Sequence, residues 1–150
     1  MLTGEIVVER LRPNKVTHKV VGDLNDLLKK QHSEAMPVSR EHLLERMREV
    51  VVVVAWNHNE RVVGMGVLII VAGLNFTCGD IRHFVINDGL NILSVGMRIV
   101  QELMNFHLHG IAYYEGGVWV QDEEMKRIFT ALGFEEKPQS RYRLRVPKVL

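Results

Sequence analysis

Alternating or continuous apolar residues mark the strands that this chain is expected to form. Residues 5–11 (EIVVERL) partly alternate, as in a half-exposed strand that ends before Pro13. Five consecutive valines within residues 50–56 favour a second strand, because β-branched side chains lose less freedom on a pleated surface than in a helix. The nearly continuous apolar run of residues 61–71 predicts a strand covered on both faces. Residues 50–56, 61–71 and 80–86 (DIRHFVI) together predict a meander of three antiparallel strands.

Apolar residues spaced three and four positions apart predict two helices after the first strand. Residues 23–31 (DLNDLLKKQ) place three leucines on one face, and Asp23 is the expected N-terminal cap. A second helix is expected after Ser39, which can cap it, with an apolar stripe that includes Leu43 and Met47. Both helices are expected to lie on the sheet.

A third and a fourth helix are expected in the second half of the chain. Residues 95–107 follow the helical spacing, with Gly110 placed as a left-handed cap. Residues 111–120 (IAYYEGGVWV) then predict a strand, in which Gly116 and Gly117 indicate a bulge or a close backbone approach. Asp122 is the expected cap of the last helix, which Gly133 ends, and RYRLRV near the C-terminus is an alternating strand.

Composition and charge limit the class of protein. The 150 residues are 47% hydrophobic and 25% charged, which is the size and composition of one globular domain over residues 1–150. The net charge of +1 provides no global field for nucleic acid, so nucleic-acid binding is not expected, even though Arg141, Arg143 and Arg145 share one strand face. The pair His107 and His109 does not share a helical face, so no metal site is expected.

The N-terminus and the single cysteine point to a cytoplasmic protein. Glu5 and Glu9 interrupt the first apolar stretch, unlike a secretory signal. The longest apolar run, residues 62–74, is shorter than a membrane span, so no membrane partner is expected. Cys78 has no partner for an intrachain disulfide and is interpreted as an unreactive loop thiol.

The order β-α-α-β-β-β-α-β-α-β and the closing segment IFTALGF resemble the GNAT superfamily of acyl-CoA-dependent N-acyltransferases. In that family a helix ending in Gly-Phe follows a capping Asn eleven residues before the Gly, and here Asp122 precedes Gly133 by eleven residues. The resemblance covers about residues 50–147 well and the N-terminal third by element order. It implies an α/β fold of the α+β type, with a mixed, mostly antiparallel central sheet flanked by helices.

The family's cofactor motif is Arg or Gln, two residues, Gly, one residue, then Gly or Ala. The matching positions in this chain are Asn91, Ile92, Leu93, Ser94, Val95 and Gly96. Asn91 replaces the Arg or Gln, and Ser94 replaces the first glycine. The motif works because backbone amides at a helix start point toward a diphosphate, and amides do not require a particular side chain. The alternative is a simple strand-to-helix connection with Ser94 as N-cap.

The resemblance also implies a site for acetyl-CoA along the strand of residues 80–86. Its pantetheine amides are expected to pair with the backbone near Phe84, Val85 and Ile86, residues that also suit an ordinary core. Acyl transfer needs a base for the acceptor amine. Asp80 falls at the family's carboxylate position, although it also suits a turn after Gly79. His83 is the second candidate, or else a surface strand residue.

The family's usual acid is a Tyr four residues before the helix-ending Gly, where this chain has Phe129. Tyr113 or Tyr114 is a possible substitute, and Tyr114 is the residue we select. Neighbouring strand residues face opposite ways, so only one of the two can point into a cleft, and either can simply pack.

Two functions follow from the resemblance. The first is an N-acetyltransferase that moves an acetyl group from acetyl-CoA to an amine of a small molecule or protein by direct attack. The second is a GNAT-fold binding or assembly module without catalysis, suggested by Asn91, Ser94 and Phe129. Homodimerisation is possible in either case.

Overall fold

The computed structural model describes residues 5–105, 111–116 and 123–135. Its centre is a five-stranded sheet in the order β1-β2-β3-β4-β5, in which β5 is parallel to β4 and the other neighbours are antiparallel. The strands are β1 (Val7–Arg10), β2 (Val50–Trp56), β3 (Val62–Ala72), β4 (Thr77–Ile86) and β5 (Ile111–Gly116). The predicted fold class and the predicted meander, formed by β2, β3 and β4, are confirmed.

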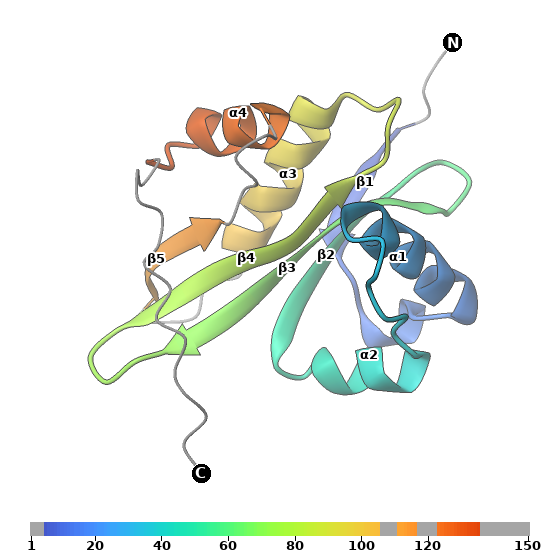
Figure 1. Cartoon of the computed structure of the whole chain (residues 1–150), viewed down its shortest axis with the longest axis horizontal. Coiled ribbons are helices and arrows are strands. Elements are labelled where there is room, and N and C mark those ends of the chain that lie inside the picture. Colours follow the sequence, from blue (N-terminus) through green and yellow to red (C-terminus); the bar gives the residue numbers. More distant parts are fainter. Residues whose placement is uncertain (1–4, 106–110, 117–122, 136–150) are drawn as a thin grey trace.

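The helices form a layer on each face of the sheet (Figure 1). α1 and α2 lie on one face and α3 and α4 on the other. The helical segments are η1 (Pro13–Lys15), α1 (His18–Gln31), α2 (Arg40–Arg46), α3 (Ile92–Met104) and α4 (Glu123–Ala131). Two hydrophobic cores result, one between the sheet and each helical layer.

The valine run of β2 supplies both cores at once. Val51 and Val53 pack in the core under α3, whereas Val52 and Val54 pack in the core under α1. Successive side chains of a strand point to opposite faces, so a central strand buried on both sides needs apolar residues at every position. The unbroken run is therefore the signature of a strand between two helical layers.

Glycines of β3 let α3 approach the sheet closely. A methyl group at Gly64 would lie 3.2 Å from Cδ1 of Ile99, and one at Gly66 would lie 2.9 Å from Cγ2 of the same residue. Ile99 is fully buried. The two glycines in an otherwise apolar strand therefore make room for the middle of α3.

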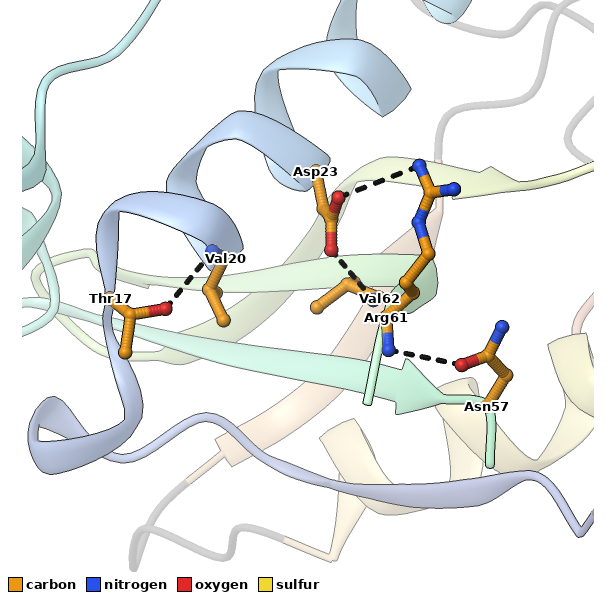
Figure 2. Close-up of polar contacts among 6 residues, drawn as sticks. All are labelled: Thr17, Val20, Asp23, Asn57, Arg61 and Val62. Atoms are coloured by element: carbon orange, nitrogen blue, oxygen red, sulfur yellow. Dashed lines mark hydrogen bonds and ion pairs between the residues drawn. The ribbon is translucent and has the colours of Figure 1, made fainter. Parts of the chain in front are cut away.

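The predicted start of α1 at Asp23 is wrong. The helix begins at His18, and the Thr17 hydroxyl accepts a hydrogen bond from the Val20 amide at 3.2 Å (Figure 2). Asp23 lies inside the helix, only 7% exposed, where its carboxylate accepts a hydrogen bond from the Val62 amide at 3.1 Å. The sequence suggested a cap because Asp is a common one, but a long-range partner uses its oxygen instead.

The remaining helix ends agree with the sequence in two cases and differ in a third. Ser39 caps α2 through the His42 amide, as predicted. Gly133 ends α4, as predicted: it has φ +89°, a left-handed conformation, and the Phe134 amide donates to the Phe129 carbonyl. α3 begins at Ile92, three residues earlier than predicted.

Several sequence predictions lie outside the described residues. They concern His107, His109, Gly110, Gly117, Asp122 and the strand at residues 141–146. Within the described residues, no helix combines the length and the apolar character that crossing a bilayer requires.

Candidate functional site

β4 and β5 stay paired over only part of β4. Their parallel register runs from Thr77 opposite Ile111 to Ile81 opposite Gly116. β4 continues to Ile86, so its last five residues extend past the described end of β5. In Figure 1, β5 lies beside β4 at the left, and β4 continues past it toward the start of α3. The far half of β4 thus presents a strand edge that β5 does not cover among the described residues.

A β-bulge interrupts β4 where this edge begins. Met65 of β3 pairs with Val85 and Val67 pairs with Arg82, so three steps along β4 match two along β3. His83 is the inserted residue and has φ +52°, a left-handed conformation that non-glycine residues rarely adopt. Arg82 and His83 are both exposed, which breaks the alternation of a regular strand. Backbone strain of this kind concentrates at functional sites.

The surroundings of His83 favour its neutral form. Burial of part of the ring lowers the pKa of His83 below its ordinary value of 6.5, and the positive charge of Arg82 lowers it further. The side chain still reaches solvent. At neutral pH the imidazole therefore has a free lone pair and can accept a proton.

Asp80 lies in the interior of β4, opposite Ile69 of β3 and Glu115 of β5, and so is not the turn residue that the sequence allowed. Its carboxylate accepts a hydrogen bond from Nε of Arg82 at 2.7 Å, and its side chain is 19% exposed. The two side chains share a face because they are two positions apart. Asp80 is thus held by a cation beside the bulge.

Tyr114 faces the α3 side of the sheet. It packs against that core, and its hydroxyl donates a hydrogen bond to the Met104 carbonyl at 3.1 Å. Burial raises its pKa. Tyr113 points the other way, is 45% exposed and stacks on Phe76, so the two tyrosines face opposite sides as expected. In this arrangement the Tyr114 hydroxyl joins β5 to the end of α3.

Phe129 and Cys78 both occupy buried positions. Phe129 is part of an aromatic cluster with Phe84 and Phe134, and its ring lies where a side chain at Gly116 would be. Cys78 is 6% exposed within β4, so its predicted place in a loop is wrong. β4 begins at Thr77, earlier than its polar first residues suggested.

The segment 91–96 forms the N-terminal end of α3. Asn91, rather than Ser94, is the cap: its side-chain oxygen accepts a hydrogen bond from the Ser94 amide at 3.1 Å. The Val95 amide donates to the Asn91 carbonyl, so the amides of Ile92 and Leu93 precede the first intrahelical bond. No acidic residue lies in this first turn. The helix end therefore offers amides and a positive dipole end to an anion.

The apolar residues of this segment differ in their surroundings. Ile92 packs against the core under α3, and Leu93 is 44% exposed. Gly96 is fully inside, and a methyl group there would overlap Cδ1 of Ile128. Gly96, the last position of the cofactor motif, therefore allows α3 and α4 to pack closely.

The side chains of Phe84, Val85 and Ile86 are all buried. The contacts with pantetheine predicted there would therefore be made by backbone groups. No sequence pattern predicted that α1 reaches this edge of β4. Nε2 of Gln31 lies 3.5 Å from the Phe84 carbonyl, and Nζ of Lys30 lies 3.2 Å from the Asp88 carboxylate. These contacts join residues more than fifty positions apart, so no local pattern encodes them.

Among the described residues, no three His, Cys, Asp or Glu side chains lie together in a way that could hold a metal ion. The bulge of β4, the Asp80–Arg82 pair and the start of α3 all lie along one stretch of chain, residues 80–96.

No known family's sequence profile matches the chain, and no curated protein sequence matches it either. Solved structures do match. An acetyltransferase from Trypanosoma brucei has a TM-score of 0.72 at 18% identity, over 95% of this chain and 99% of that one. Glucosamine-6-phosphate N-acetyltransferase from Arabidopsis thaliana has a TM-score of 0.69 at 17% identity, over 97% and 98%.

A third similar structure is an aminoglycoside acetyltransferase from an uncultured soil metagenomic sample, in complex with sisomicin. Its TM-score is 0.70 at 14% identity, over 97% of this chain and 95% of that one. Likeness over nearly the full length of both chains establishes a common fold, whereas identities this low leave the chemistry to the residues of the site.

Proposed function

We propose that this chain, which has the fold of the GNAT acetyltransferases, is an N-acetyltransferase that takes its acetyl group from acetyl-CoA. The observation that carries the proposal is the coincidence of three features along residues 80–96: the uncovered edge of β4, the bulge at His83 and the amide-bearing start of α3.

The start of α3 suits the diphosphate of the coenzyme. The amides of Ile92 and Leu93 precede the first intrahelical hydrogen bond and would be the donors to an anion. The Asn87 amide bonds to Val63 of β3, and successive residues of a strand direct their N–H and C=O groups to opposite sides. The N–H and C=O groups of Phe84 and Ile86 therefore point away from β3. These groups would hold the pantetheine arm, and the bound coenzyme supplies a reactive thioester.

His83 is the residue that we assign to proton removal. When the acceptor nitrogen attacks the thioester carbonyl, a C–N bond forms, the C–S bond breaks and the ammonium proton must leave the nitrogen. His83 is exposed at the bulge and neutral at pH 7 because its pKa is lowered. Asp80, the other candidate, already accepts a hydrogen bond from Arg82 and is assigned to positioning. The thiolate takes a proton from water, because Tyr114 bonds to Met104.

The acceptor is a primary amine of a small molecule or of a protein. Two similar structures are named for amino sugars or aminoglycosides, so glucosamine 6-phosphate and an aminoglycoside are suitable first acceptors to assay.

Binding and chemistry can be tested separately. Acetyl-CoA at about a hundred times its Kd should stabilise the fold by about 2.7 kcal/mol in a thermal melt. Ser94→Asp places a carboxylate in the exposed first turn of α3, where it favours the helix but repels a diphosphate. It should abolish the shift, whereas Ser94→Asn should keep it. No shift in the wild-type chain would reject coenzyme binding.

The chemical step is tested by thiol release with a panel of amines. His83→Gln should keep the thermal shift and slow release by about a hundredfold or more. Asp80→Asn should slow it less. If the shift is present but no amine stimulates release, the non-catalytic binding module is the better account, since Asn91, Ser94 and Phe129 all differ from the family pattern. An unchanged rate in His83→Gln would remove His83 from the proton transfer.

A further inference from the structure

A groove beside β1, at the opposite end of the strand order from β5, takes no part in the proposed chemistry. It has a volume of about 590 Å³. It lies where the chain leaves β1 toward η1 and passes the junction of α2 with β2. The β1–β2 register ends with Arg10 opposite Val53, and the Leu11 amide then bonds to the Val52 carbonyl at 2.8 Å. Beyond this bond the two segments separate and the groove opens between them.

The floor of the groove is apolar. Leu11 and Val52 are almost completely buried in the core under α1, and Met47 and Val50 pack against that core from its edge. Pro13 also lines the groove. Leu11 and Val52 close the groove from below, and the more exposed Pro13, Met47 and Val50 provide a surface for the hydrocarbon part of a ligand, as in most small-molecule sites.

The polar side chains that line the groove are those of Arg10, Arg12 and Asn14, and among the described residues no acidic side chain lines it. Acidic residues close by in the sequence are engaged elsewhere: Glu9 pairs with Lys15 at 3.6 Å, and Glu49 pairs with Arg46 at 3.9 Å. Guanidinium groups match the planar oxygens of carboxylates and phosphates and bind them in a bidentate manner.

We propose that this groove is a binding site for a small organic anion, a carboxylate or phosphate ester attached to an apolar body. Arg12 holds the anionic head, and the side chains of Pro13, Met47 and Val50 cover the apolar body. The volume falls within the usual range for such sites, about 300–1,000 Å³. β2 and β3 separate β1 from β4, a distance of about 14 Å at ordinary strand spacing. The site is therefore distinct from the acetyl-transfer site and does not depend on it.

The test is an NMR titration of the full ¹⁵N-labelled chain with phenyl phosphate as the probe. Amide shifts of Leu11, Asn14 and Met47 should saturate with a Kd of about 1 mM or tighter. Benzoate tests whether a carboxylate can replace the phosphate. Phenol carries the ring without the charge, and inorganic phosphate carries the charge without the ring. Both single-feature probes should bind at least about tenfold more weakly than phenyl phosphate, because each lacks one half of the proposed recognition.

Matched arginine variants locate the binding. Arg12→Gln should weaken phenyl phosphate about tenfold, the loss expected for one charge-assisted contact. Arg48→Gln removes an exposed arginine close to the groove that does not line it, and should change the Kd by less than about twofold. The amide spectrum of each variant reports that it is folded. Linear shifts up to about 10 mM with both phenyl phosphate and benzoate, equal binding of inorganic phosphate, or equal losses in the two variants would overturn the proposal.

Discussion

The carboxylate of Asp23, buried within α1, accepts a hydrogen bond from the backbone amide of Val62 at 3.1 Å (Figure 2). The same carboxylate lies 3.8 Å from Nη2 of Arg61, whose own amide donates to Asn57 at 3.0 Å. α1 is thereby fixed to the first residue of β3 and to the turn that precedes it. Together with the contacts of Lys30 and Gln31 to Asp88 and Phe84, this contact fixes the orientation of α1 across the sheet, since apolar packing alone would let the helix shift.

Asp23→Ala should destabilise the fold by about 1–3 kcal/mol, because it leaves the Val62 amide unsatisfied in a buried place. Asp23→Asn keeps an acceptor oxygen and should lose less, since the exposed Arg61 contributes little. Urea unfolding measures both. Asp26→Ala, on the exposed side of the same helix, is the control and should stay within about 0.5 kcal/mol. Equal losses for Asp23→Ala and Asp26→Ala would contradict this role.

Gly96→Ala should destabilise the fold by about 1 kcal/mol. Alanine favours a helix, but its methyl group would overlap Ile128 of α4, and overpacking outweighs the gain. Ile128→Val, which removes the atom in question, should recover part of the loss in the double variant. Gly22→Ala in α1 is the matched control: it meets no atom within 4 Å and should stabilise by about 0.5–1 kcal/mol. Thermal melts decide, and a stabilising Gly96→Ala would show that α3 and α4 are not in this contact.

Tyr114→Phe should reduce stability by about 0.5–1.5 kcal/mol, the usual contribution of one hydrogen bond, because the Met104 carbonyl loses its donor. The ring packing remains. The rate of thiol release should not change beyond about twofold, since we assign the hydroxyl to structure. A loss of rate without a loss of stability would instead identify Tyr114 as the catalytic acid.

Stability should fall as pH decreases through the range below 6.5, partly because of His83. Its pKa is lower in the folded chain than the ordinary value of 6.5, so in that range the unfolded chain binds more protons and acid favours unfolding. His83→Gln removes this contribution, so the free energy of unfolding should depend less on pH below 6.5. Above pH 6.5 the two chains should show the same pH dependence. Urea midpoints of the two chains at about pH 7.5 and 5.5 test this. Parallel pH profiles would mean that the His83 pKa is not lowered.

Local patterns predicted most of the secondary structure correctly. The valine run gave β2, and the long apolar run gave β3, because a strand buried on both faces must be apolar throughout. Ser39 and Gly133 were identified as helix ends because capping involves only neighbouring residues. The caps at Asp23 and Ser94 were misassigned for the opposite reason: several residues near a helix start can cap it, and Asp23 bonds to a strand 39 positions away.

The sequence by itself determined the order of elements and the two-layered burial of the sheet, since these follow from hydrophobic periodicity along the chain. It also singled out the residues of the proposed site, Asp80, His83 and the segment 91–96. Only the tertiary structure decided their surroundings. The left-handed bulge at His83, the Arg82 contact to Asp80, and the packing of Gly96 on Ile128 all arise from the pairing of β4 with β3 and the docking of α4 on α3. Such contacts depend on residues brought together by folding, which no local pattern records.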